Sequence, residues 1–280
     1  MKTYLAVGIG DFVCIDSLLT KEEKESMSEI YWGCRFGYAI SELLSSNICY
    51  PNLKKHHIIP DEVGKSLMNS VEPNACEFWH FRPDFRGRAE MFLDKFSINR
   101  NDINIVDAAA ILNDPNRKFI KSSIVDNCLQ ININNLTSNS YVLVHQPTST
   151  RPRSDIARIT NEDWIEIIKF SKYVNKKLVI ITDVDLNLPN SEDIIVLKNF
   201  DIKLYPYLVK NCYYYIGCDS FIAGMAAKCL PANKISIKSH DPHVDRYIET
   251  TRGSKYFLPH SVEEVKSFYK PFFEYKLWEQ

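Results

Sequence analysis

The chain has few glycines and no closely paired cysteines, and each shortage excludes a class of protein. Only 9 of its 280 residues are glycine, which excludes collagen-like and glycine-rich linker sequences and makes each glycine at a strand end informative. The 8 cysteines are scattered, without a Cys-x-x-Cys pair. We therefore expect buried, reduced thiols rather than a disulfide or zinc framework.

Long apolar runs and an excess of one charge are also missing. No stretch approaches the ~18 consecutive apolar residues that a membrane span needs. The first residues run into Asp11 and Asp16 and lack the pattern of a signal peptide. Lysine and arginine number 34 against 35 acidic residues, for a formal net charge of −1, which provides no general attraction to nucleic acid or membranes. We expect a cytoplasmic protein with no membrane span.

What the chain does contain is the composition and pattern of an α/β protein. Its hydrophobic content is 45%, ordinary for a globular chain long enough for two domains. Short apolar runs alternate with helical segments, which favours parallel sheets. In the first half we expect strands at 4–8, 29–34 and 77–81, helices at 12–19, 36–45 and 87–96, a buried element at 103–112 and a polar loop at 20–28.

The pattern is clearer in the second half. Strands are expected at 141–145, 177–182, 194–197, 213–217 and 234–237, and helices at 164–174, 203–212 and 221–229. The segment 127–140 is rich in Asn and Ser, so we predict an N-terminal domain of residues 1–138 and a C-terminal domain of 139–260. Residues 261–280 predict an amphipathic helix, interrupted at Pro271, that packs back on the first domain.

Two loops that follow predicted strands carry residues suited to binding a ligand. Gly8-Ile-Gly-Asp11 places two glycines and a carboxylate at the start of a predicted helix. Asp11 also suits a plain N-cap, and the two glycines do not complete the Gly-x-Gly-x-x-Gly fingerprint of dinucleotide binding. The loop after His145 combines hydroxyl and guanidinium groups, which bind diphosphates well, although a solvated loop explains it equally. Its candidate ligand-binding residues are Thr148, Ser149, Thr150, Arg151 and Arg153.

The third strand end is Gly217-Cys-Asp-Ser-Phe221. Backbone N–H groups at the start of the following helix attract anions, and the Asp219 carboxylate can accept hydrogen bonds from sugar hydroxyls. A simple N-cap remains the alternative for Asp219.

In order and spacing, these strand ends resemble the GT-B glycosyltransferases of the ADP-heptose:lipopolysaccharide heptosyltransferase family. The resemblance covers residues 138–240, and residues 1–45 through one motif. It rests on the stretches Gly8-Ile-Gly-Asp11, Val144-His-Gln-Pro-Thr-Ser-Thr150, Asp163-Trp164, 178–182 and 217–227. It implies two Rossmann-type domains facing a cleft and a C-terminal helix crossing back to the first.

The resemblance also implies an activity: transfer of a sugar from a nucleotide-diphosphate sugar to an acceptor hydroxyl, with no metal and no further cofactor. Asp11 would be the general base. The donor-binding residues would be Gly10, Thr148, Ser149, Thr150, Arg151, Arg153, Asp183, Asp185, Phe200, Asp219, Ser220 and Phe221. Arg82, Arg86 and Arg88 are candidates for binding the acceptor, for which a saccharide is favoured and a modified nucleic acid is possible.

The family's Asp-(Ser/Thr)-Gly-x-x-His motif has Phe221 in place of its Gly and Gly224 in place of its His. This departure leaves open a catalytically silent module that keeps the GT-B shell. A metal-dependent enzyme is a second alternative, because Asp183-Val-Asp185 has the Asp-x-Asp pattern that holds a divalent ion on a donor diphosphate.

Overall fold

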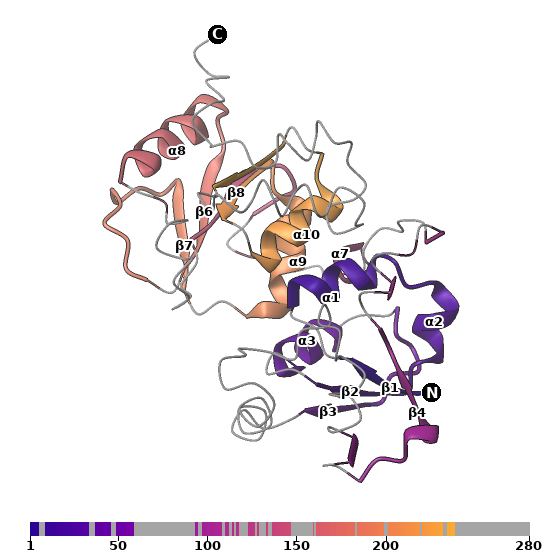
Figure 1. Ribbon diagram of the computed structural model, residues 1–280. Helices are drawn as coiled ribbons and strands as arrows, with labels where there is room; N and C mark the ends of the chain where they lie inside the picture. The colour runs from indigo at the N-terminus through magenta and orange to yellow at the C-terminus, as the bar shows by residue number, and fades with distance from the viewer. Residues whose placement is uncertain are drawn as a thin grey trace. The chain divides into compact units, whose positions relative to one another are not determined.

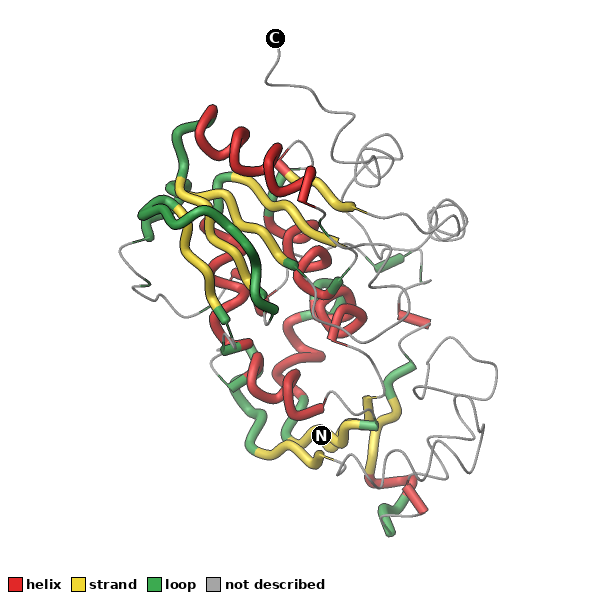
Figure 2. The backbone as a smooth tube through the Cα atoms, turned by 90° about the vertical axis from the view of Figure 1, so that its left-hand side faces the viewer, coloured by secondary structure: helices red, strands yellow, loops and turns green. Residues whose placement is uncertain are grey.

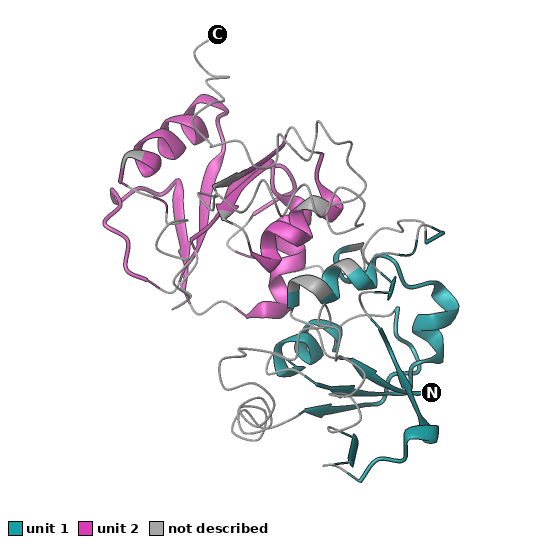
Figure 3. Ribbon diagram, viewed as in Figure 1, with its two compact units in different colours: residues 1–127 teal, residues 128–280 magenta. Residues whose placement is uncertain are grey.

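The computed structural model describes two compact units, Met1–Asn127 and Cys128–Gln280 (Figure 3). The described residues are 1–5, 9–33, 37–45, 49–58, 93–94, 97–107, 110–111, 114, 116–117, 123–126, 128, 133, 136–146, 159, 161–182, 184–198, 201–218, 220–231 and 234–238. The predicted strand at 77–81, nearly all of the predicted helix at 87–96 and the C-terminal helix at 261–280 lie outside them. The described residues of each unit form one sheet.

The first unit is built on a parallel sheet in the order β3-β2-β1-β4 (Figure 1). Its strands are β1 (Lys2–Leu5), β2 (Glu29–Trp32), β3 (Lys55–Ile58) and β4 (Ile103–Ile105), the last preceded by the short helix η1 (Arg100–Asp102). The central strand β1 is buried from its second residue onward. The chain therefore enters the core of this unit almost at its first residue.

Helices α1 (Ile9–Asp16) and α3 (Gly37–Leu44) cover one face of this sheet. Phe12 of α1 meets Trp32 of β2 edge-on, with ring centroids 5.5 Å apart. A Cβ at Gly37, the first residue of α3, would lie only 2.8 Å from Trp32 Cγ, so glycine allows α3 to approach the strand closely. Both helices are thus fixed through the same tryptophan.

A buried carboxylate holds the end of α1 in place. Asp16 is fully buried and pairs with the Lys24 ammonium at 3.0 Å. It also accepts hydrogen bonds from the Tyr50 hydroxyl at 2.9 Å and from the Ile124 backbone at 3.2 Å, in α7 (Ser123–Asp126). Because these partners satisfy both carboxylate oxygens, the charge is tolerated away from water.

The second unit has a five-stranded parallel sheet in the order β7-β6-β5-β8-β9. Its strands are β5 (Tyr141–His145), β6 (Lys177–Ile181), β7 (Ile194–Leu197), β8 (Tyr214–Cys218) and β9 (Ile235–Lys238). The chain adds strands on one side of β5 and then returns to add β8 and β9 on the other. The strand order therefore reverses between β5 and β8, which is a topological switch point.

Helices cover both faces of this second sheet (Figure 2). Helix α8 (Asn161–Tyr173) packs Trp164, Ile167 and Phe170 on the face that carries Val142, Val144 and Ile216. On the opposite face, the Tyr141 hydroxyl donates to the carbonyl oxygen of Leu208 at 2.7 Å, in α9 (Tyr205–Asn211), which follows the short helix η3 (Ile202–Leu204). Helix α10 (Phe221–Cys229) packs beside α9.

In each sheet a tyrosine ring occupies the space beside a glycine. A Cβ at Gly33 would overlap the Tyr4 hydroxyl and lie 2.6 Å from its Cζ. A Cβ at Gly217 would overlap the Tyr215 hydroxyl and lie 2.7 Å from its Cζ. Both tyrosines are fully buried, so these rings have little freedom to move away.

The α/β class with two parallel sheets is confirmed, and the predicted strands of the second half lie within one residue of the observed ones.

The polar loop predicted at 20–28 is wrong. Residues Lys21–Ser26 form α2, which begins with a capping box in which Thr20 and Glu23 exchange hydrogen bonds. Strand β3 was not predicted, because Lys55 and two histidines hide its periodicity. Across the described residues, no helix has the length and apolar character to span a membrane.

Candidate functional site

The switch point of the second sheet brings together a histidine and a serine. His145 is the last residue of β5, and Ser220 follows the neighbouring strand β8 after one intervening residue. Their side chains meet, with His145 Nδ1 3.2 Å from Ser220 Oγ. Open α/β sheets bind ligands outside the carboxyl ends of their strands at such a point. We therefore place the candidate site here.

Ser220 also begins the helix that starts at this point. Its Oγ accepts a hydrogen bond from the Ala223 backbone N–H at 3.3 Å, which makes Ser220 the N-cap of α10. The positive end of the helix dipole and the remaining N–H groups of the first turn therefore lie beside the imidazole. This combination of imidazole, hydroxyl and helix N-terminus suits a negatively charged ligand group.

Phe221 and Gly224, which depart from the family motif, have different surroundings. The Phe221 ring stacks on Tyr205 of α9, with centroids 5.7 Å apart and planes at 23°. This contact packs α10 on α9, and the ring at the start of α10 is partly buried. A Cβ at Gly224 would meet nothing within 4 Å. A side chain at position 224 is thus sterically possible.

Buried polar residues hold the chain where it leaves β5 and β6. Gln146 is 4% exposed, donates its backbone N–H to the Ile181 carbonyl at 3.0 Å and accepts from the Ile159 N–H through its side chain at 3.2 Å. Thr182 is 1% exposed and accepts from the Val184 N–H through its hydroxyl at 3.2 Å. These bonds fix the first residue of each loop that the sequence predicted to contact the donor.

One carboxylate of the Asp-x-Asp pattern already has a cationic partner. The Lys198 ammonium forms an ion pair with Asp185, whose side chain is 95% exposed, and this contact lowers the pKa of Asp185 below its ordinary value of 3.8. Asp183 is outside the described residues. Within the described part of the chain, no three His, Cys, Asp or Glu side chains gather as they would around a metal ion.

In the first unit, the predicted catalytic motif lies at the start of a helix beyond the carboxyl end of β1. Strand β1 ends at Leu5 and α1 begins at Ile9, so Gly10 and Asp11 belong to the first turn of α1. The backbone of these two residues is helical, and their side-chain surroundings lie outside the described part of the structure. Phe12 and Asp16 anchor the same helix to β2 and α2.

Most of the other predicted site residues lie outside the described part of the chain. They are Arg82, Arg86, Arg88, Thr148, Ser149, Thr150, Arg151, Arg153, Asp183, Phe200 and Asp219. Of the predicted donor-binding set, the structure places Ser220 and Phe221 together at the start of α10 and Asp185 beyond β6. His145 is the residue that the sequence interpretation missed, although its position as the last residue of a predicted strand marked it.

Comparisons with known proteins add structural neighbours. No protein-family model matches the chain, and no curated protein matches it by sequence. It is similar to a solved structure of E. coli heptosyltransferase WaaC with ADP-2-deoxy-2-fluoro heptose, at 10% identity and a TM-score of 0.48, covering 85% of this chain and 88% of that one. It is similar to WaaC with ADP at 11% identity, a TM-score of 0.48 and coverage of 85% and 87%.

A third neighbour is a family 9 glycosyl transferase from Veillonella parvula, with 11% identity, a TM-score of 0.48 and coverage of 84% and 78%. These neighbours bear the names of the glycosyltransferase group that the sequence motifs resemble. At 10–11% identity, each of them is a likeness in the course of the chain alone.

Proposed function

We propose that this protein is a glycosyltransferase that moves a sugar from a nucleotide-diphosphate sugar to an acceptor hydroxyl. The observation that carries the proposal is the meeting of His145 and Ser220 at the switch point, beside the N-terminus of α10. In the reaction the bond between the sugar's anomeric carbon and the diphosphate oxygen breaks, and the leaving nucleoside diphosphate keeps the electron pair. Groups that stabilise this developing negative charge lower the barrier most.

The donor diphosphate is expected to lie between α10 and the hydroxyl and guanidinium groups of residues 148–153. Arginine there supplies paired hydrogen bonds to phosphate, and the helix N-terminus supplies backbone N–H groups. The Asp11 carboxylate takes the proton of the acceptor hydroxyl as its oxygen attacks the sugar, so it serves as the general base. Arg82, Arg86 and Arg88 would hold an acidic or phosphorylated acceptor, and a saccharide is favoured.

A metal is not required in this proposal. The ion pair of Asp185 with Lys198 supports that view, because one of the two carboxylates of the Asp-x-Asp pattern is engaged with a side-chain cation. The role left to the loop after β6 is to accept hydrogen bonds from the ribose hydroxyls of the donor. Chelation with EDTA is therefore expected to leave turnover unchanged, and loss of turnover restored by a divalent ion would favour the metal-dependent alternative.

The test is release of nucleoside diphosphate from a panel of nucleotide sugars, with donor binding measured separately. Asp11→Asn is expected to lower turnover by about 10²–10⁴-fold with donor affinity unchanged, as for loss of a general base. His145→Ala is expected to weaken donor binding. Asp102→Asn, which alters an exposed carboxylate of η1, is the matched control and should change neither.

Two outcomes would contradict the proposal. Near wild-type transfer by Asp11→Asn would remove the catalytic assignment. Donor binding without turnover of any nucleotide sugar by the wild-type chain would favour the catalytically silent module.

A further inference from the structure

The amino edge of the second sheet, at the opposite ends of the strands from His145 and Ser220, gathers lysines around one aromatic ring. The Lys176 ammonium lies 5.2 Å from the centre of the Tyr213 ring, and the Lys234 ammonium lies 4.9 Å from it. Lys176 precedes β6 and Lys234 precedes β9, and these strands lie on opposite sides of the β5–β8 pair. Tyr213 therefore draws together two cations from separate parts of the sheet.

Two more lysines extend this group along the same edge. Lys177 is the first residue of β6, and Lys172 lies in the last turn of α8. Among the described residues, Lys172, Lys176, Lys177 and Lys234 form no ion pair. The acidic residues that the described strands place on this edge are Glu192 and Asp193, just before β7. We call the four lysines with Tyr213 the amino-edge patch.

An exposed aromatic side chain lies beside the amino-edge patch. Tyr173, next to Lys172 at the end of α8, is 64% exposed. Basic residues with an exposed tyrosine are features of a surface that rests at the headgroup level of a bilayer.

We infer that the amino-edge patch docks the protein on a membrane surface rich in anionic phospholipid headgroups. The patch contains lysine and no arginine among its described residues. Lysine is a flexible point charge suited to a diffuse layer of headgroups, whereas arginine, with its planar fork of donors, is the residue favoured in nucleic-acid recognition. The inference goes beyond the proposed function and does not depend on it. Docking through this edge would leave the carboxyl edge of the sheet, where His145 lies, directed away from the lipid.

The test is co-sedimentation of the full chain with vesicles of phosphatidylcholine, with and without phosphatidylglycerol. We expect binding to the phosphatidylglycerol vesicles at low salt and its loss at high salt, because surface attraction is screened. Lys176→Glu/Lys234→Glu is expected to weaken binding about tenfold or more. Lys21→Glu/Lys54→Glu makes the same change in net charge on exposed residues of the first unit and should bind as the wild type does.

Lys176→Gln/Lys234→Gln removes the two charges and leaves an aliphatic stem with a neutral polar end at each position. It replaces the charge-reversed variant in the test if that variant does not fold. It too should bind phosphatidylglycerol vesicles more weakly. No binding by the wild-type chain, or equal weakening by the Lys21 and Lys54 variant, would overturn the inference. Salt-sensitive binding to random-sequence DNA without binding to vesicles would instead make the patch a nucleic-acid surface, which also overturns it.

Discussion

At the scale of single residues, two glycines of the second unit have opposite packing environments. Gly217 faces the buried Tyr215 ring, whereas Gly224 faces open space in the middle of α10. The same substitution should therefore have opposite effects at the two positions.

We predict that Gly217→Ala lowers the free energy of unfolding by about 1–3 kcal/mol, because the new methyl group overpacks against a rigid ring. Gly224→Ala should raise it by about 0.5–1 kcal/mol, because alanine favours a helix interior over glycine. Urea unfolding of both variants measures the difference. Equal effects of the two substitutions would contradict the packing described here.

The distinction between these glycines is not visible in the sequence. Gly217 is notable there only as a glycine at a strand end. The structure shows that the neighbour of Gly217 is the ring of Tyr215, two residues earlier on the same face of β8. Contacts of this kind depend on side-chain direction and burial, which residue spacing alone does not define.

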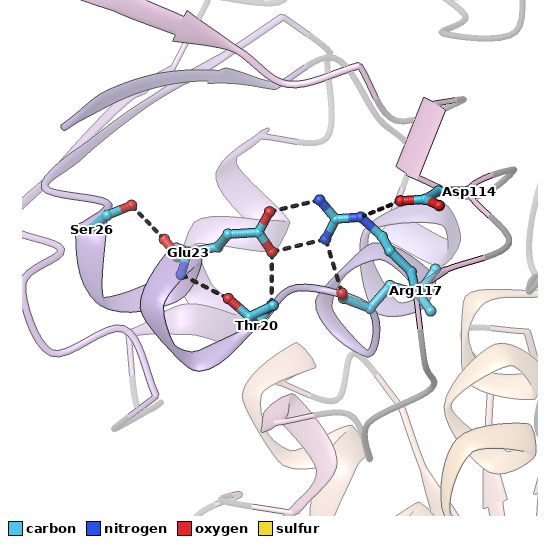
Figure 4. Close-up of polar contacts among 6 residues, drawn as sticks. Thr20, Glu23, Ser26, Asp114 and Arg117 are labelled. Carbon is cyan, nitrogen blue, oxygen red and sulfur yellow. Dashed lines mark hydrogen bonds and ion pairs between the residues drawn. The ribbon is translucent and has the colours of Figure 1, made fainter.

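At the scale of elements, α2 is joined to a distant segment by an arginine (Figure 4). Arg117 Nη1 and Nη2 donate to the two carboxylate oxygens of Glu23 at 2.8 and 2.7 Å, and Nη1 also donates to the Leu18 carbonyl at 3.1 Å. The Arg117 hydrogen bonds lower the pKa of Glu23 below its ordinary value of 4.5. Glu23 therefore both closes the capping box of α2 and holds a residue far along the chain.

This pair should make stability depend on pH. Because the pKa of Glu23 is lower in the folded state, its contribution is present above about pH 4.5 and is lost as pH falls through the folded-state pKa. We predict that Arg117→Met lowers the free energy of unfolding by about 1 kcal/mol at neutral pH, a modest value because Glu23 is partly exposed. The difference from wild type should shrink as the pH falls below that range.

Lys21→Met is the matched control, because Lys21 forms an exposed i,i+4 pair with Glu25 in the same helix. It should change stability little at any pH. Denaturant unfolding of the three proteins between acidic and neutral pH gives the comparison. A constant difference between wild type and Arg117→Met across that range would contradict the prediction.

The elements that the sequence predicted best are those with buried apolar runs. Strands β5, β6 and β7 consist largely of Val, Ile and Leu, and their predicted bounds agree with the structure to within one residue. Helix α2 is almost wholly polar, and β3 carries charged and imidazole side chains, so hydrophobic periodicity misses both. The Thr20 and Glu23 spacing was the available indication of a helix start.

The candidate site was predicted in part for the same reason. Ser220 was found because it follows a strong strand and precedes a strong helix. Its contact with His145 depends on β5 and β8 being neighbours in the sheet, although His145 and Ser220 are 75 positions apart in the sequence. Strand order is a property of the whole sheet, and residue spacing along the chain does not contain it.

At the scale of the whole molecule, the chain folds as two units that each have their own sheet and core. The C-terminal segment 261–280 is predicted to complete this organisation with an apolar face. The residues of that face are Val262, Val265, Phe268, Tyr269, Phe272, Phe273 and Leu277. Burial of each large side chain stabilises a fold by about 1.5–3 kcal/mol.

We predict that a chain ending at His260 loses most of a typical stability of about 5–15 kcal/mol and becomes poorly soluble. Phe268→Ser in the full chain should lower the melting temperature in the same direction, whereas Glu264→Ala, outside the apolar set, should have little effect. Thermal melting and solubility measure both. A shortened chain that melts like the full one would show the segment to be dispensable.

The two glycine–tyrosine contacts also restrict the order in which this sequence can change over time. At Gly33 a larger residue is blocked while the Tyr4 ring fills the adjacent space, and the same holds at Gly217 with Tyr215. Replacement of the ring by a smaller side chain opens that space first, and only then does a larger residue at the glycine fill it. Descendant sequences should therefore keep each pair or exchange both members, with the tyrosine changing before the glycine.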